Sequence, residues 1–212
     1  MKDIVIIGAG GFGKEVAWLI EQINKKSPTW NLLGFVDDQI EVETIINGYP
    51  VLGDIDYLND KAYNLICSIS HSQTRQKIVF KLQKTKNKFA KLVHPNIELS
   101  SSVMIGEGSI ICEGVRFTVN ISISNHVIIY HNSVICHDSK IGDYTTILPS
   151  VNISGNVNLE GCNLIGTGAQ IVQNLNIGQN SIIGAGAVVV KDIQSNEVQV
   201  GVPAKKIKEL SE

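Results

Sequence analysis

Three histidines stand close together in the C-terminal half of the chain, His126, His131 and His137. An imidazole has an unperturbed pKa of about 6.5, so each could act as a general base at neutral pH or as a metal ligand. Only His137 is followed directly by a carboxylate, Asp138, which could orient the ring and stabilise its protonated form. His137 is therefore the candidate for a catalytic base, with Asp138 as its acidic neighbour. For each of the three histidines taken alone, a structural place at a corner or an interface is the alternative.

A zinc site of the γ-carbonic anhydrase type is a second interpretation of these histidines. Such a site needs three histidines, two of them five residues apart and the third well upstream. His126 and His131 have the first spacing, but Ala90 stands where the upstream histidine would be. We predict no metal ligand in this chain.

A hydrophobic residue recurs at every sixth position through the same region. A period of six fits neither the 3.6-residue turn of an α-helix nor the two-residue alternation of a strand. It is the hexapeptide signature of a parallel β-helix, whose short strands bend at corners and stack coil on coil. Three hexads make one triangular coil, so residues 18 apart are stacked. The ladder consists of Val93, Leu99, Ile105, Ile111, Phe117, Ile123, Ile129, Ile135, Ile141, Ile147, Ile153, Leu159, Ile165, Ile171, Ile177, Ile183 and Val189.

Glycine and asparagine residues between the ladder positions are expected to form the corners of the coils. Both residue types tolerate a positive φ. Gly155 stands 18 residues beyond His137 and lacks a side chain, so we expect room for a ligand beside the imidazole. The residues expected at corners are Gly106, Gly108, Gly142, Asn156, Gly161, Asn174, Gly178 and Gly184.

The first ninety residues have a different pattern, strand–helix–strand. A buried strand at 3–7 leads into Gly8, Gly10 and Gly13 in GxGxxG spacing, and an amphipathic helix follows. Such a turn lets a phosphate approach backbone amides at a helix N-terminus. Further strands are expected at 32–36 and 65–70 and a helix near 73–85, a unit about half the size of a dinucleotide-binding fold. We therefore predict a mononucleotide or nucleotide-sugar ligand, with Asp38 placed to meet a ribose.

The resulting prediction is an α/β N-terminal half-Rossmann domain at 1–91, a β-helix at 92–194 and a C-terminal tail at 195–212. A net charge of −2 and a pI of about 6.2 give no basic surface for nucleic acid. No apolar run approaches the length of a membrane span, and no signal peptide is expected. The four cysteines have no metal-binding spacing, which favours reduced thiols in the cytoplasm.

Several short motifs, taken together and in order, resemble those of one family. They lie at 8–13 (GAGGFG), 35–38 (FVDD), 135–138 (ICHD), 153–157 (ISGNV), 165–168 (IGTG) and 201–205 (GVPAK). The chain resembles the bacterial sugar O-/N-acyltransferases of the hexapeptide-repeat, left-handed β-helix superfamily. Within it, the chain is most similar to UDP-4-amino-4,6-dideoxy-sugar N-acetyltransferases and sialic acid O-acetyltransferases.

The resemblance implies an acetyl-CoA-dependent N-acetyltransferase that acts on a nucleotide-linked amino-deoxysugar in surface glycan or glycoprotein biosynthesis. It implies a homotrimer, with His137 as the base and Asp138 beside it. The residues that it places at the nucleotide sugar are Gly8, Ala9, Gly10, Asp37, Asp38 and Ser70. Those that it places at acetyl-CoA are Thr146, Gly155, Thr167, Ala185 and Pro203.

Five residues depart from the family pattern, and these departures leave the identity of the sugar open: Phe12, His71, Tyr130, His131 and Thr146.

Two other functions stay open. A sugar O-acetyltransferase of the sialic acid type would use the same base on a hydroxyl. A non-catalytic β-helix trimer, which serves structure or binding, would not bind CoA. A sugar nucleotidyltransferase is disfavoured because its larger catalytic domain is absent.

Overall fold

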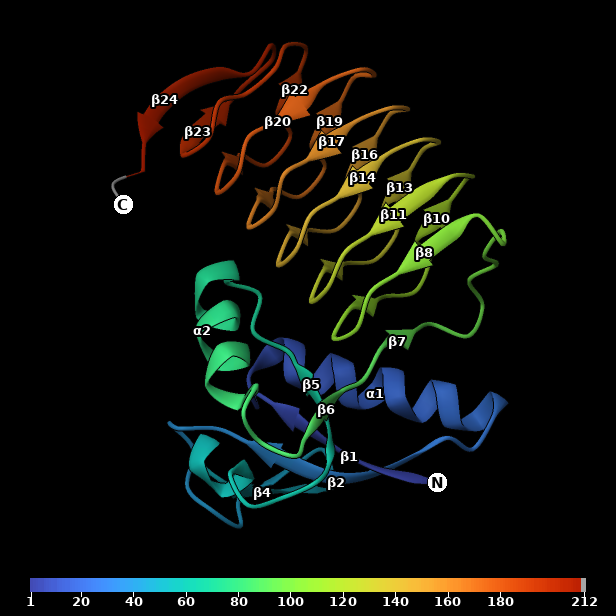
Figure 1. Ribbon diagram of the computed structural model, residues 1–212, viewed down its shortest axis with the longest axis vertical. Coiled ribbons are helices and arrows are strands. Elements are labelled where there is room, and N and C mark those ends of the chain that lie inside the picture. Colours follow the sequence, from blue (N-terminus) through green and yellow to red (C-terminus); the bar gives the residue numbers. More distant parts are fainter. Residues whose placement is uncertain (211–212) are drawn as a thin grey trace. The chain divides into compact units, whose positions relative to one another are not determined.

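The computed structural model describes residues 1–210, which divide into two compact units, Met1–Pro95 and the chain from Asn96 onward (Figure 1). The N-terminal unit is α/β, and the second unit is a parallel β-helix. The expected α/β unit and the β-helix of hexapeptide repeats are thus confirmed, and the trimer stays a prediction. The predicted boundaries at 91/92 and 194/195 stay a prediction. We find no helix in the described part of the chain that is long and apolar enough to cross a membrane.

The N-terminal unit is built on a six-stranded sheet with the order β3-β4-β2-β1-β5-β6. All neighbouring strands are parallel except the β3–β4 hairpin. Its elements are β1 (Lys2–Ile7), α1 (Gly11–Lys26), β2 (Trp30–Val36), β3 (Ile45–Ile46), β4 (Tyr49–Gly53), the 3₁₀ helix η1 (Ile55–Leu58), β5 (Asn64–Cys67), α2 (Ser72–Leu82), β6 (Lys88–Phe89) and β7 (Leu92–Val93). The hairpin and η1 were not expected from the sequence, and β5 ends three residues before Ser70.

Helix α1 follows the glycine turn and buries one face. Val16, Leu19 and Ile20 are buried at the three- and four-residue spacings that place side chains on one side of a helix. Gly13 is buried as well, and a Cβ atom there would collide with the carbonyl oxygen of Gly8. The third glycine of the turn is therefore required for the close packing of helix and strand.

The strands of the second unit fall into three sheets, which are the three sides of the coil. Ser122 pairs with Lys140 and Ile123 with Ile141, the predicted spacing of 18 residues. One side is β8 (Val103–Ile105), β11 (Ile121–Ile123), β14 (Lys140–Ile141), β17 (Asn158–Leu159) and β20 (Asn176–Ile177). The second is β10 (Arg116–Phe117), β13 (Val134–Ile135), β16 (Asn152–Ile153), β19 (Gln170–Ile171) and β22 (Val188–Val189). The third is β9 (Ile110–Ile111), β12 (Ile128–Ile129), β15 (Thr146–Ile147), β18 (Leu164–Ile165), β21 (Ile182–Ile183), β23 (Glu197–Val200) and the antiparallel β24 (Lys205–Glu209).

The ladder residues form the core of the β-helix. Every ladder residue from Ile123 to Val189 is buried, and each is the last residue of its strand. The ladder begins differently, because Leu99 is 43% exposed and residues 96–102 form no strand. The first coil is therefore incomplete, and it leaves Phe117 only half-buried.

A corner with positive φ recurs at every sixth residue, from Gly108 to Gly186, always three residues after a ladder position. Asparagine, aspartate and glycine adopt this conformation at least cost. Some of the glycines expected at these corners have another role. Each directly follows a ladder residue, and a Cβ atom would collide with the neighbouring coil. These glycines are Gly106, Gly142, Gly178 and Gly184.

Replacing Ile141 with alanine should lower the free energy of unfolding by about 2–5 kcal/mol, because it empties a fully buried position of the core. Lys140→Ala is the matched control, since Lys140 is exposed in the same strand and should change stability by no more than about 0.5 kcal/mol. Urea denaturation followed by circular dichroism measures both. Equal losses in the two variants would contradict the ladder as the core.

Candidate active site and nucleotide pocket

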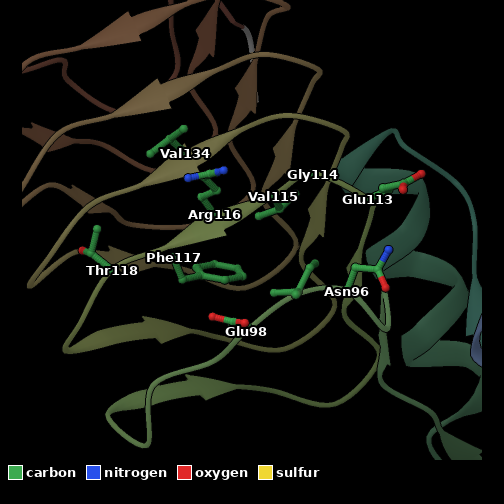
Figure 2. A pocket seen from close by; sticks show the side chains of 10 residues that line it. Asn96, Glu98, Glu113, Gly114, Val115, Arg116, Phe117, Thr118 and Val134 are labelled. Carbon is green, nitrogen blue, oxygen red and sulfur yellow. The ribbon is translucent and has the colours of Figure 1, made fainter. Parts of the chain in front are cut away.

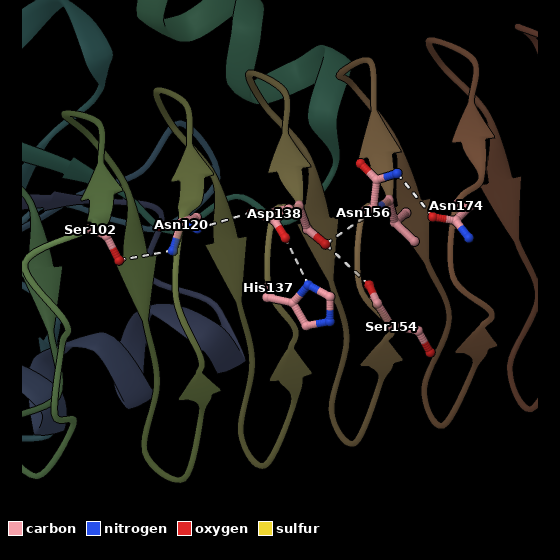
Figure 3. A network of polar contacts seen from close by, with 9 residues as sticks. Ser102, Asn120, His137, Asp138, Ser154, Asn156 and Asn174 are labelled. Carbon is pink, nitrogen blue, oxygen red and sulfur yellow. Dashed lines mark hydrogen bonds and ion pairs between the residues drawn. The ribbon is translucent and has the colours of Figure 1, made fainter.

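The predicted base and its carboxylate lie together at the corner that follows β13. Nδ1 of His137 is 2.8 Å from Oδ2 of Asp138 (Figure 3). Asp138 occupies the positive-φ position of this corner, with φ of 60°, and its side chain can therefore turn back toward the preceding residue. The side chains of His137 and Asp138 are 60% and 51% exposed. A substrate can reach both of them.

The contact fixes the chemistry of the ring. The hydrogen bond from His137, and after it one from Asn120, hold the pKa of the Asp138 carboxyl below its usual value. An ionised carboxylate only accepts hydrogen bonds, so Nδ1 of His137 must carry the proton. Nε2 of the neutral imidazole is then left with a lone pair that can remove a proton from a substrate.

Gly155 lies one coil beyond His137, and it admits the imidazole itself. A Cβ atom on Gly155 would lie 2.5 Å from Cε1 and 2.6 Å from Nε2 of His137. The expectation that this space is free for a ligand is therefore wrong, because the ring occupies it. The missing side chain allows the imidazole to lie close to the backbone of the next coil. A direct contact between Gly155 and CoA stays a prediction.

The other two histidines occupy different corners. His126 has a positive φ, is 4% exposed and stacks on Tyr144 one coil beyond, with ring centroids 5.1 Å apart. His131 is half-buried at the corner before that of His137. Neither has the adjacent carboxylate of His137, and the described residues contain no cluster of three His, Cys, Asp or Glu side chains that could hold a metal ion.

The residues predicted to contact acetyl-CoA are distributed over several coils. Thr167 and Ala185 are exposed, 18 residues apart, at the corners that continue the column of His131. A backbone hydrogen bond from Gly186 to the Thr167 carbonyl joins these two coils. Pro203 is exposed in the turn between β23 and β24, whereas Thr146 is fully buried in β15. The sequence alone did not indicate the burial of Thr146.

The N-terminal unit holds a pocket of about 270 Å³ at the carboxyl ends of β1 and β2. In parallel sheets, ligands bind at the carboxyl edge near the point where the strand order changes direction, which in this sheet lies between β1 and β5. Gly8, Asp37 and Asp38, three of the predicted nucleotide-sugar residues, line it. The other lining residues are Ile7, Val36, Gln39, Ile55, Ile69, Thr74 and Ile78. The sequence analysis missed most of these, since Ile55 comes from η1 and Thr74 and Ile78 from α2.

The remaining predicted residues of this site do not line the pocket. The amide of Ala9 donates to Oδ2 of Asp37 at 2.8 Å, so it is already occupied. Gly10 caps α1 and has open space where a Cβ atom would be. The carbonyl of Ser70 accepts a hydrogen bond from the buried Arg75 guanidinium at 3.1 Å. Asp37 therefore organises the glycine turn, and Asp38 is the more exposed carboxylate.

A second hollow, of about 630 Å³, lies beside β10 at the incomplete first coil (Figure 2). Phe117 and Arg116 of β10 line it together with Glu98, and its lining includes none of the predicted site residues. It exists because no complete coil covers this end of the β-helix.

The chain was compared with known proteins. Residues 3–82 match the family described as the PglD N-terminal domain. The chain is 34% identical to the GDP-perosamine N-acetyltransferase of Escherichia coli O157:H7 over 173 residues. The aligned region covers 79% of this chain and 77% of that protein. The chain belongs to the hexapeptide-repeat N-acetyltransferases of nucleotide-linked amino sugars.

Solved structures agree with this assignment. The acetyltransferase domain of PglB from Neisseria gonorrhoeae FA1090 has a TM-score of 0.89 at 28% identity, over 98% of this chain and 100% of that one. PerB from Caulobacter crescentus, in complex with CoA and GDP-perosamine, has a TM-score of 0.86 at 30% identity, over 98% of both chains. The expected enzyme class, acetyl donor and acceptor class are confirmed at the level of the family.

Gly155→Ala should lower kcat at least about tenfold, because the added methyl group would displace the His137 ring by more than about an ångström. The collision is with the His137 ring. When His137→Ala has removed the ring, adding Gly155→Ala should therefore cause no further loss of stability. Steady-state kinetics and thermal unfolding of both single variants and the double variant measure this. A Gly155→Ala enzyme with unchanged kcat would show that the ring does not act from its position in this structure.

Proposed function

We propose that this protein transfers the acetyl group of acetyl-CoA to the amino group of a nucleoside-diphosphate-linked 4-amino-4,6-dideoxy sugar. The observation that carries the proposal is the His137–Asp138 pair, in which Nδ1 faces the carboxylate and both side chains are exposed, so that Nε2 is the ring nitrogen left for a substrate. The names of two relatives support the acceptor class. They are the GDP-perosamine enzyme and the UDP-N-acetylbacillosamine N-acetyltransferase of Bacillus subtilis (strain 168). The latter is 31% identical over 116 residues, 52% of this chain and 51% of that protein.

In the proposed reaction, the amine nitrogen of the sugar attacks the thioester carbonyl of acetyl-CoA. Nε2 of His137 takes the proton that the nitrogen loses, and the nearby Asp138 stabilises the imidazolium. The C–S bond then breaks as the amide forms, and the proton passes from His137 to the departing CoA sulfur. Thr146, Gly155, Thr167, Ala185 and Pro203 are the proposed contacts of CoA, with Thr146 needing a movement because it is buried.

The nucleotide part of the acceptor is proposed to bind at the glycine turn of the N-terminal unit, at Gly8, Ala9, Gly10, Asp37, Asp38 and Ser70. The positive end of the α1 dipole favours phosphate there. The apolar wall contributed by Ile55, Ile69 and Ile78 suits the flat face of a base. This pocket supports a nucleotide-linked sugar over free sialic acid.

The active assembly is proposed to be a homotrimer in the cytoplasm. The three-sided coil is compatible with a closed cyclic assembly. No disulfide joins the four cysteines of the described residues, which a reducing compartment favours. Sedimentation velocity gives the molar mass of the assembly.

His137→Ala should lower kcat by about 10² to 10⁴, the usual contribution of a positioned general base, with little change in KM for acetyl-CoA. His131→Ala and His126→Ala should keep most of the activity, because neither ring has a carboxylate directly beside it in sequence. The assay offers acetyl-CoA with GDP-, UDP- and dTDP-linked amino sugars and, separately, free sialic acid. A dead His131→Ala enzyme and an active His137→Ala enzyme, both of native molar mass, would overturn the assignment of the base.

Gly10→Asp should raise KM for the nucleotide sugar about tenfold or more and leave KM for acetyl-CoA unchanged. The new carboxylate would lie at the helix N-terminus, where it repels the diphosphate but has space and a favourable helix dipole. Thermal unfolding should therefore show no loss of stability. An unchanged KM for the nucleotide sugar would argue that its phosphates bind elsewhere.

A further inference from the structure

Four corner residues at 18-residue spacing form a column along the β-helix: Asn120, Asp138, Asn156 and Asn174 (Figure 3). All four have φ between 55° and 63°. Asparagine and aspartate are both suited to this conformation, so the backbone alone does not distinguish among them. Asp138 is the single carboxylate of the four, and its hydrogen bonds differ from those of the asparagines.

Each oxygen of Asp138 has its own donor. Oδ1 accepts a hydrogen bond from Nδ2 of Asn120 at 3.1 Å, and Oδ2 lies 2.8 Å from Nδ1 of His137. Asn120 is held in turn, because its backbone N–H donates to Oγ of Ser102 at 2.9 Å. Asn156, on the other side of Asp138, donates its amide to Asn174 at 3.0 Å instead.

We propose that Asn120 is a positioning residue for acetyl transfer. It holds the Asp138 carboxylate in the orientation that keeps the proton of His137 on Nδ1 and leaves Nε2 free. This inference rests on the proposed function, in which His137 is the base. Asn120 is not assigned contact with either substrate and acts through Asp138.

The need for such a residue follows from exposure. The side chains of His137 and Asp138 are both more than half exposed. A solvent-exposed hydrogen-bonded pair, like an exposed ion pair, is weakly ordered by itself, because both side chains keep alternative rotamers in water. A second donor on the other carboxylate oxygen opposes rotation of the group, since rotation would break two hydrogen bonds instead of one.

Asn120→Gly tests the proposal, with Asn156→Gly as its matched control. Glycine is accepted at these corners, as Gly108, Gly114, Gly168 and Gly186 show. Asn120→Gly should lower kcat about threefold to tenfold, with KM for both substrates unchanged. The ¹⁵N chemical shifts of the His137 ring, measured without substrates above the pKa of the imidazole, should show a mixture of tautomers. Asn156→Gly should leave kcat and the tautomer as in the natural enzyme.

The outcomes separate this inference from the proposed function. If His137→Ala is inactive and Asn120→Gly matches Asn156→Gly in kcat and in ring tautomer, Asn120 has no positioning role but the base stands. A lowered kcat with an unchanged tautomer also overturns the inference, because it indicates a general structural effect. If His137→Ala is fully active, the proposed function fails, and this inference fails with it.

Discussion

The second unit depends on one constraint, the 18-residue register of the backbone hydrogen bonds between successive coils. Each strand from β8 to β22 is only two or three residues long and has little stability of its own, so it is ordered by the neighbouring coils. The register holds only if the chain turns at every sixth residue. The positive-φ corners from Gly108 to Gly186 supply that turn without interruption. An insertion of one residue would move a ladder side chain out of the core. Each side chain exposed in this way would lower the free energy of unfolding by roughly 1.5–3 kcal/mol.

The proposed catalytic corner, at His137 and Asp138, depends on the same register. Asp138 stands where the backbone needs a residue that tolerates a positive φ, and its neighbours along the column are asparagines. A carboxylate at this one corner keeps the backbone geometry and adds a charge beside His137. The next coil then has to leave space for the imidazole, and Gly155 does so. The site thus needs few changes to a regular corner of the β-helix.

In the N-terminal unit, a few close contacts hold the glycine turn in place. Gly13 permits α1 to approach the end of β1, and the amide of Ala9 is held by the Asp37 carboxylate. A second oxygen of Asp37 accepts from Gln39, so this side chain links the ends of β1 and β2. A carboxylate after the second strand therefore does not by itself identify a ribose ligand, because here one of the two shapes the turn.

The sequence by itself determined the period, and with it the β-helix, the stacked positions and the pairing of His137 with Asp138 and Gly155. These follow from spacing along the chain, which a repeat makes visible. It also indicated the strand–glycine–helix turn. Only the tertiary structure decided that Gly106 and Gly142 serve close packing instead of corners, that the His137 ring fills the space over Gly155, and that η1 contributes Ile55 to the nucleotide pocket. The physical reason is that spacing places Cα atoms, whereas contacts depend on side-chain direction and on which coils are present. Leu99 shows the limit, because it has the right spacing and is exposed where the first coil is incomplete.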